Sequence, residues 1–308
     1  EKHIAALGWV ADARELPLYL VGGSWRALGR VHIHGTGFPL PVIANHIMPT
    51  DAGIFLRKYL KDRDQEELRQ IPRLPPSRLP MLEDSAAMLD ALARAIRPSQ
   101  FVICASGLRE GLLFEALPEK IRSEDPLVSG AQFTAEQHRR FPGYGEALRL
   151  WLARAFGDEG HELVRLRDTA ALLADLGWAS TPEFRALGGE ELALHGSWMG
   201  VHAQDRAMLA MALFSSFGGN EDATPLLHQL APAKLLNRAH IWGLAIRLAH
   251  RLSGGTAEAL GKCHLLRDGD MLLLRIPGKY GPLDNISVRR RLERLGAVLG
   301  VQTEIRIA

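Results

Sequence analysis

The stretch Leu18-Tyr19-Leu20-Val21-Gly22-Gly23-Ser24-Trp25-Arg26 decides how the first part of this chain folds. Its first four residues favour a β-strand, and Gly22-Gly23 interrupt them. Apolar residues from Trp25 to Val31 then recur at helical spacing. The pattern predicts a strand, a tight turn and a helix. Backbone amides at the start of such a helix face an anion.

A second stretch further along the chain has the same order. Phe101–Cys104 reads as a buried strand, Ser106-Gly107 break it, and a helix carrying Arg109 and Glu110 begins there. Two parallel units of this kind place both turns at one edge of a sheet, where α/β proteins bind ligands. We therefore expect an anion site, with Arg109 as its main side chain because a guanidinium binds phosphate oxygens bidentately.

The two stretches together resemble a known family. Val21–Leu28 followed by Ser106–Leu113 is similar to the exopolyphosphatase/guanosine pentaphosphate phosphatase family of the actin-like and sugar-kinase fold, and the likeness extends through Ile71-Pro72, Arg78–Pro80 and Arg97–Ser99. The resemblance implies a hydrolase that releases terminal phosphate from inorganic polyphosphate, guanosine pentaphosphate or both. It implies Mg²⁺ as cofactor and a homodimer. The phosphate-binding residues expected are Gly22, Gly23, Ser24, Gly107, Arg109 and Glu110.

The resemblance also implies that part of the enzyme is missing from this sequence. In the family, a catalytic glutamate and an Asp-x-Gly-Gly-Gly-Ser loop lie in the first half of the actin-like fold, and this sequence has neither, nor an initiator methionine. We expect residues 1–118 to be the second actin-like subdomain and the chain to be a fragment. No catalytic residue is assigned, and the fragment is expected to be inactive alone.

The middle of the chain is predicted to be helical. Charges, prolines and glycines mark residues 119–143 as a connection, and residues 144–254 have helical patterning. Leu172-Leu173-Ala174-Asp175-Leu176-Gly177 resembles the core motif of the HD phosphohydrolase fold, which holds metals between His and Asp ligands. Ala174 replaces the signature histidine, His195 falls where a later ligand would sit, and His250 stands at the final aspartate. Because a transition metal needs three or more ligands, we expect no metal at the degenerate positions Asp175 and His195.

Residues 255–308 are predicted to form a small α+β domain, with a hairpin turning at Asp268-Gly269 and a helix over 288–299. Arg289, Arg290 and Arg291 on that helix are interpreted either as a solvated face or as a path for a polyanion. The fold class expected is thus α/β plus α. His32, His34 and His46 have no carboxylate or cysteine at ligand spacing, so we expect solvated or edge histidines.

Composition narrows the function classes. The chain is 47% hydrophobic, carries a formal net charge of +2 and has two cysteines. These values predict a cytoplasmic protein with no membrane or nucleic-acid partner and with any anion site local. Two alternatives stay open: a non-catalytic regulatory protein that binds guanosine tetraphosphate or pentaphosphate, and an HD-type phosphohydrolase that acts without the first half.

Overall fold

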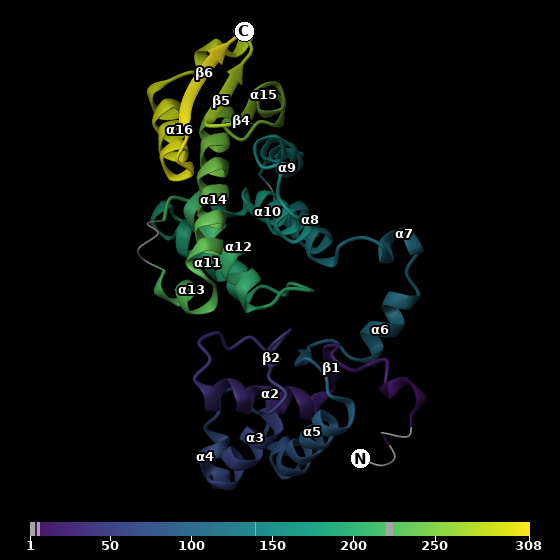
Figure 1. Ribbon diagram of the computed structural model, residues 1–308. Helices are drawn as coiled ribbons and strands as arrows, with labels where there is room; N and C mark the ends of the chain where they lie inside the picture. The colour runs from purple at the N-terminus through teal and green to yellow at the C-terminus, as the bar shows by residue number, and fades with distance from the viewer. Residues whose placement is uncertain (1–3, 5–6, 139, 220–223) are drawn as a thin grey trace. The chain divides into compact units, whose positions relative to one another are not determined.

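The computed structural model describes residues 4, 7–138, 140–219 and 224–308, and it divides the chain into two compact units, residues 1–123 and 124–308. Figure 1 shows a mixed α/β fold that is mostly helical, with one small sheet in each unit. This agrees with the expected class, α/β plus α. No helix among the described residues is long and apolar enough to cross a membrane.

Unit 1 is built around a three-stranded sheet. Its elements are β1 (Leu18–Val21), α2 (Gly23–Thr36), β2 (Ile47–Met48), α3 (Ala52–Lys61), α4 (Gln65–Arg69), α5 (Leu82–Ile96), β3 (Phe101–Cys104), α6 (Leu108–Glu115) and α7 (Glu119–Arg122), with a 3₁₀ helix at Pro76–Met81.

The sheet has the strand order β1-β3-β2. β1 and β3 run parallel, with Leu18 opposite Phe101 and Val21 opposite Cys104, so both strands end at the same edge. The two strand-turn-helix units predicted from the sequence are confirmed. β2 is antiparallel to β3 and was not predicted, since two residues are too few to show a periodic pattern.

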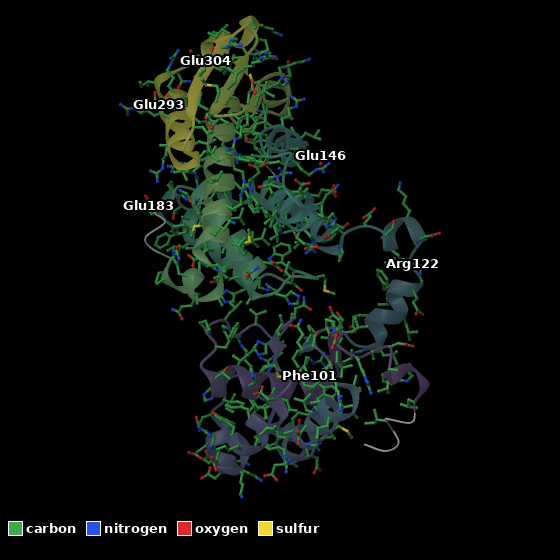
Figure 2. All side chains as sticks on the ribbon, viewed as in Figure 1. Phe101, Arg122, Glu146, Glu183, Glu293 and Glu304 are labelled. Carbon is green, nitrogen blue, oxygen red and sulfur yellow. The ribbon has the colours of Figure 1, made fainter. Side chains whose placement is uncertain are left out.

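The core of unit 1 lies between the sheet and its helices. Phe101 is fully buried, and Figure 2 shows it among the packed side chains of this unit. Helices α3 and α5 approach closely because position 53 is glycine: a Cβ there would lie 2.6 Å from the backbone nitrogen of Asp90. Asp90 Oδ2 in turn forms an ion pair with Arg94 Nη1 at 2.6 Å, one helical turn away.

The expectation of solvated or edge histidines is wrong for His32 and His46. Both are buried, and His32 Nδ1 lies 3.0 Å from His46 Nε2. Burial lowers the pKa of both rings, that of His46 to about 3 with a further contribution from His32. A neutral imidazole can donate to another, which satisfies the pair inside an apolar core. His34 is exposed, and its Nδ1 lies 3.0 Å from the Tyr59 hydroxyl.

Unit 2 contains a helical bundle followed by a second sheet. Its elements are α8 (Pro126–His138), α9 (Tyr144–Ala155), α10 (His161–Leu173), α11 (Arg185–His195), α12 (Ala203–Ser216), α13 (Pro225–Leu230), α14 (Ala233–Ser253), α15 (Ala257–Lys262), β4 (His264–Asp268), β5 (Met271–Ile276), α16 (Ile286–Leu299) and β6 (Gln302–Ile307).

Helices α12 and α14 form the centre of the bundle. A Cβ at Gly243 of α14 would lie only 2.5 Å from the Ala212 carbonyl oxygen of α12, so the glycine permits this close approach. A buried ion pair also ties the bundle together: Glu159 lies 3.2 Å from Arg167 and accepts a hydrogen bond from Trp242 Nε1 at 2.8 Å. These contacts fix α10 and α14 around a common core.

The end of the chain agrees with its prediction. β4 and β5 form an antiparallel hairpin, β6 pairs parallel to β5, and α16 packs against β6 and α14. Residues 119–143 hold α7 and α8, and α8 packs against α10 within unit 2. Domain boundaries at residues 118, 143 and 254 stay predictions.

Candidate functional site

The two predicted turns lie side by side at the edge where β1 and β3 end. We call this region, made of Gly22–Arg26 and Ala105–Glu110, the strand edge. Arg26 Nη1 donates a 2.6 Å hydrogen bond to the Ala105 carbonyl oxygen, which ties the first turn to the second. The sequence predicted that the turns would meet, and their register in the sheet brings them together.

The first turn opens helix α2. Gly22 is the N-terminal cap of α2 with a φ of 136°, a conformation that favours glycine. No side chain caps this helix, and its first turn has no acidic residue. The guanidinium of Arg78 lies against Gly23, since a Cβ there would be 2.9 Å from Arg78 Nη2. A second cationic side chain therefore reaches the turn from the 3₁₀ helix.

Sequence reasoning missed Arg78 as a site residue. The stretch Ile71–Pro80 reads as a proline-rich connector, although Arg78 lies within the resemblance to the family. The connector instead folds so that Arg78 is half-buried beside Gly23. An arginine in a proline-rich segment gives no periodic signal, so only the family likeness could have pointed to it.

The second turn is held by Glu110. Glu110 Oε2 accepts a 2.7 Å hydrogen bond from the Gly107 backbone N–H. Backbone hydrogen bonds from Gly107 and from its own N–H lower the pKa of Glu110, and Arg109 and Arg26 lower it further. The Gly107 amide is thus already bonded, and Glu110 positions the turn. Arg109 is exposed and has no ion pair among the described residues.

The strand edge suits an oxyanion. Arg26, Arg78 and Arg109 place three guanidinium groups around two turns, and Glu110 is the single carboxylate among the groups described here. Guanidinium groups bind phosphate oxygens through paired N–H donors. A divalent cation needs several oxygen ligands, which these residues do not supply, so the strand edge by itself does not fit a magnesium site.

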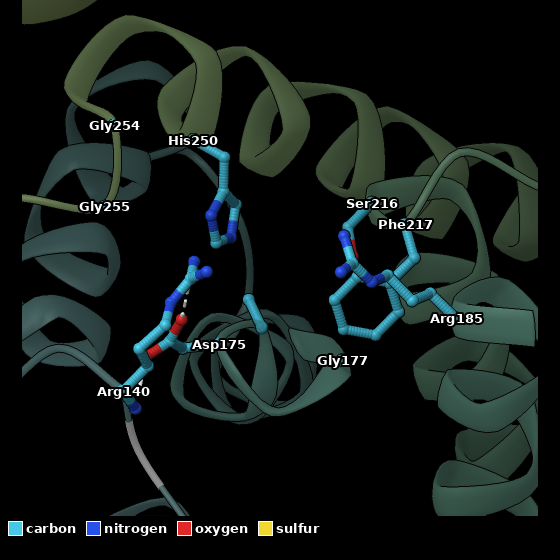
Figure 3. Close-up of a pocket in the computed structure, with 10 residues that line it drawn as sticks. Arg140, Asp175, Gly177, Arg185, Ser216, Phe217, His250, Gly254 and Gly255 are labelled. Atoms are coloured by element: carbon cyan, nitrogen blue, oxygen red, sulfur yellow. Dashed lines mark hydrogen bonds and ion pairs between the residues drawn. The ribbon is translucent and has the colours of Figure 1, made fainter. Parts of the chain in front are cut away.

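The degenerate metal motif lines a cavity of about 340 Å³ within unit 2. Asp175 follows α10, and its Oδ2 accepts hydrogen bonds from the backbone N–H groups of Arg140 and Phe141 at 2.9 and 3.0 Å. Arg140 Nη2 lies 3.6 Å from Asp175 Oδ1. His250 points into the same cavity from α14, as Figure 3 shows. Burial lowers the pKa of His250 to about 4, although Asp175 opposes the shift.

The structure brings Asp175 and His250 together but not His195. His195 ends α11, and its Nδ1 lies 2.9 Å from the Glu191 carboxylate. Ala174 lines the cavity and offers no ligand. In the described part of the chain, no group of three or more His, Cys, Asp or Glu residues could hold a metal ion. Arg140, which the sequence reasoning missed, supplies the positive charge beside Asp175.

The three arginines predicted as a polyanion path are consecutive in α16 and have different surroundings. Arg289 pairs with Asp284, and Arg290 is exposed. Arg291 is half-buried and faces α14, where Arg247 and Arg251 lower its pKa after the larger effect of burial. Arg247 is likewise half-buried beside Arg294, and burial and that neighbour lower its pKa. We call these four residues, Arg247, Arg251, Arg291 and Arg294, the arginine cluster.

Residues 141–305 match the family model of the exopolyphosphatase C-terminal domain, which is more than half of the 308 residues. The chain belongs to the exopolyphosphatase family. A curated relative, Retrograde regulation protein 2 of Saccharomyces cerevisiae, is 26% identical over 218 residues, covering 66% of this chain and 36% of that protein. The chain therefore spans about a third of the length of this relative.

The exopolyphosphatase C-terminal match includes Asp175, His250 and the arginine cluster, and it begins one residue after Arg140. The strand edge precedes the match, in unit 1. The family assignment therefore comes from unit 2, whereas the candidate phosphate site comes from the geometry of unit 1.

Proposed function

We propose that this chain is part of a phosphoanhydride hydrolase that releases terminal phosphate from inorganic polyphosphate, guanosine pentaphosphate or both. The observation that carries the proposal is the strand edge: two turns joined by Arg26, with Arg78 and Arg109 beside them. Membership of the exopolyphosphatase family supports the same chemistry. Residues 1–118 would be the second half of an actin-like fold, and residues 144–254 an HD-like bundle without its metal.

The proposed role of the strand edge is to hold phosphate. Phosphoryl transfer depends on positioning and on stabilising negative charge that develops on phosphate oxygens. Arg26 is fixed by its bond to Ala105, so it presents its remaining N–H groups in a set direction. Arg109 is exposed and without an ion pair within the described residues, so it can turn toward a ligand. The magnesium ion and the glutamate expected from the resemblance would come from outside these residues.

We propose that the arginine cluster is a separate contact for a polyanion, within unit 2. Its four guanidinium groups lie on two packed helices and form no ion pair with any described carboxylate. Like charges held close together, two of them half-buried, are unfavourable until an anion neutralises them. We therefore propose Arg291 and its neighbours as the polyanion path rather than Arg289, whose charge Asp284 already balances.

One alternative has a specific observation in its favour. The yeast relative is named as a regulation protein, so a non-catalytic protein that binds guanosine tetraphosphate or pentaphosphate is the second candidate. Both candidates require phosphate binding at the strand edge. They differ in whether the bound ligand is hydrolysed.

The test is phosphate release by the full-length protein from polyphosphate and from guanosine pentaphosphate. Replacing Arg109 by alanine should lower kcat/KM by roughly ten- to a hundredfold, because about 1.5–3 kcal/mol of charge-assisted hydrogen bonding is lost. Arg109→Lys should recover only part of the rate, since lysine keeps the charge but not the planar fork. Arg69→Ala is the matched control, because Arg69 is an exposed arginine of unit 1 paired with Glu66.

The outcomes separate the candidates. Unchanged kinetics in Arg109→Ala, or a loss of its thermal stability, would assign Arg109 to the scaffold. Tight binding of guanosine pentaphosphate without phosphate release would favour the regulatory candidate. The 308-residue chain alone should hydrolyse both substrates negligibly, and robust release from it would contradict the proposal.

A further inference from the structure

The cavity beside Asp175 in unit 2 has guanidinium groups on two of its walls. Figure 3 shows Arg140 next to Asp175 on one side and Arg185 on the other, beside Phe217. Arg140 precedes α9, whereas Arg185 is the first residue of α11. Folding therefore brings two cations from segments far apart in the chain to one cavity of about 340 Å³.

Both arginines have N–H donors left for a ligand. Arg185 is half-buried, and its Nε donates a 3.1 Å hydrogen bond to the Ser180 carbonyl oxygen, which fixes the direction of the guanidinium. No carboxylate of the described residues pairs with Arg185. Arg140 Nη2 lies 3.6 Å from Asp175 Oδ1, which is too far for a hydrogen bond. A ligand between the two arginines can therefore accept hydrogen bonds from both.

Two buried polar atoms at this cavity have no hydrogen-bond partner among the described residues. They are His250 Nε2 and Asp175 Oδ1. His250 is neutral at pH 7, since burial lowers its pKa to about 4, and a neutral imidazole carries its proton on either ring nitrogen. Proteins pair nearly all of their buried polar atoms, because an unpaired one costs free energy. These two atoms therefore mark the cavity as a place for a polar ligand.

The charge of the walls favours a ligand with one negative charge. Arg140 and Arg185 carry two positive charges and Asp175 carries one negative charge, so the net charge is +1 while His250 is neutral. Helices α10, α12 and α14 also end at the cavity, and helix C-termini carry partial negative charge. A phosphate group carries about −1.5 to −2 at pH 7, which would leave excess negative charge beside Asp175. A single carboxylate balances the walls.

The size and the remaining walls of the cavity suit a small organic molecule. Its volume of about 340 Å³ lies at the small end of the range for ligand pockets. Ala174 and the ring of Phe217 give it an apolar wall. Gly177 keeps the space beside that ring open, since a Cβ there would lie 2.6 Å from Phe217 Cε1. An apolar body can contact this wall while its carboxylate faces the arginines.

We propose that this cavity binds a small organic acid with a single carboxylate, held between Arg140 and Arg185. The paired N–H donors of a guanidinium match the two oxygens of a carboxylate. His250 supplies a further polar contact at the same place. The proposal goes beyond the proposed function, because it concerns a cavity within unit 2 and does not depend on phosphate binding at the strand edge.

The test is an NMR titration of the ¹⁵N-labelled 308-residue chain with propionate, benzoate and inorganic phosphate. The backbone amides of Gly177, Gly254 and Gly255 report on the cavity, which all three glycines line. We expect saturable shifts at these glycines with at least one of the two carboxylates. The Kd of that carboxylate should be roughly tenfold lower than that of phosphate, which corresponds to one unfavourable charge contact.

Substitutions of the two arginines then test the contacts. Arg185→Gln should lower carboxylate affinity by roughly ten- to a hundredfold, and Arg185→Lys should recover part of the loss because it keeps the charge but not the planar fork. Arg140→Gln should also weaken binding, and it keeps the test valid if Arg185→Gln does not fold. Arg154→Gln is the control, because Arg154 is an exposed arginine of unit 2 outside the cavity. Thermal melting checks that each variant is folded.

Asp175→Asn tests the charge argument separately. Asparagine keeps an acceptor oxygen for the backbone N–H groups of Arg140 and Phe141 but removes the negative charge. Phosphate should then bind at least as tightly as the carboxylate.

Four results would overturn the proposal. They are the absence of saturable shifts at the three glycines with either carboxylate, and equal carboxylate affinity in wild type and a folded Arg185→Gln variant. The others are phosphate binding to the wild-type cavity as tightly as the carboxylates, and an unchanged preference for carboxylate in Asp175→Asn.

Discussion

Acid should destabilise unit 1 through His46. This ring is 5% exposed, packs 5.1 Å from Phe38 between ring centres, and has its pKa lowered from 6.5 to about 3. The unfolded chain therefore binds a proton near pH 6.5 that the folded unit does not accept until about pH 3. The stability that comes from the neutral ring is complete above the unfolded pKa and is lost as the pH falls toward the folded one.

The size of the effect can be worked out from the two pKa values. Each unit of difference is worth about 1.4 kcal/mol, so moving from pH 7 to pH 5 should cost unit 1 about 2 kcal/mol through His46. The pKa of His32 is lowered in the same direction, so it adds to the loss, although Asp51 opposes its shift. An independent residue of unit 2, His250, behaves similarly with a pKa of about 4.

The assay is urea unfolding at pH 7 and pH 5 for the wild-type chain and for His46→Gln. Glutamine keeps a polar partner for His32 but does not titrate. We expect the variant to be less stable than wild type at pH 7. Its free energy of unfolding should fall by about 2 kcal/mol less on acidification, because position 46 no longer binds a proton in the unfolded chain. His250 is present in both proteins, so its contribution cancels when the two losses of stability on acidification are compared. His34→Gln is the control, because His34 is exposed. Equal acid sensitivity in wild type and His46→Gln would refute the reasoning.

Three further predictions concern unit 2. Because Ala174 interrupts the ligand set, elemental analysis should find no stoichiometric zinc, iron or manganese; about one metal per chain that disappears in Asp175→Ala would contradict this. Gly243→Ala should destabilise unit 2 by about 1–3 kcal/mol, because the new Cβ would meet the Ala212 carbonyl at 2.5 Å, whereas Gly261→Ala, with no atom within 4 Å, should not. Replacing Arg251 or Arg294 by alanine should weaken polyphosphate binding. By analogy with single-stranded nucleic acids, each replacement should also reduce the slope of log K against log salt concentration by about 0.7. Arg289→Ala should change polyphosphate affinity less than these replacements do. Equal losses of affinity in Arg289→Ala and Arg294→Ala would contradict the arginine cluster as a polyphosphate-binding site.

The sequence predicted the elements that have a strong local signal. Strands β1 and β3 lie where their apolar runs predicted them, and each ends before its glycine break. Helices α2 and α5 lie where the helical periodicity predicted them. Each of these signals depends on residues close together in the chain. The parallel pairing of β1 with β3 was also foreseeable, since helical segments separate the two strands along the chain. The hairpin of β4 and β5 was signalled by Asp268-Gly269.

The features that the sequence did not predict depend on contacts between residues far apart in the chain. Burial of His32 with His46 has no periodic signature, because histidine is not counted as apolar. Arg78 reaches Gly23 and Arg140 reaches Asp175 only after the chain has folded. The role of Glu110 was within reach, since glutamate three residues after a helix cap is a known signal at helix starts. Membership of the family was found from short motifs, and the match over residues 141–305 confirms it.

The central claim is that the strand edge binds phosphate. The most direct measurement is an NMR titration of the ¹⁵N-labelled chain with inorganic tripolyphosphate, which tracks the backbone amides of Gly22–Ser24 and Ser106–Arg109. We predict saturable shifts at both turns together, lost in an Arg26→Ala, Arg109→Ala double variant that remains folded. Shifts confined to the arginine cluster of α14 and α16, with both turns unaffected, would contradict it.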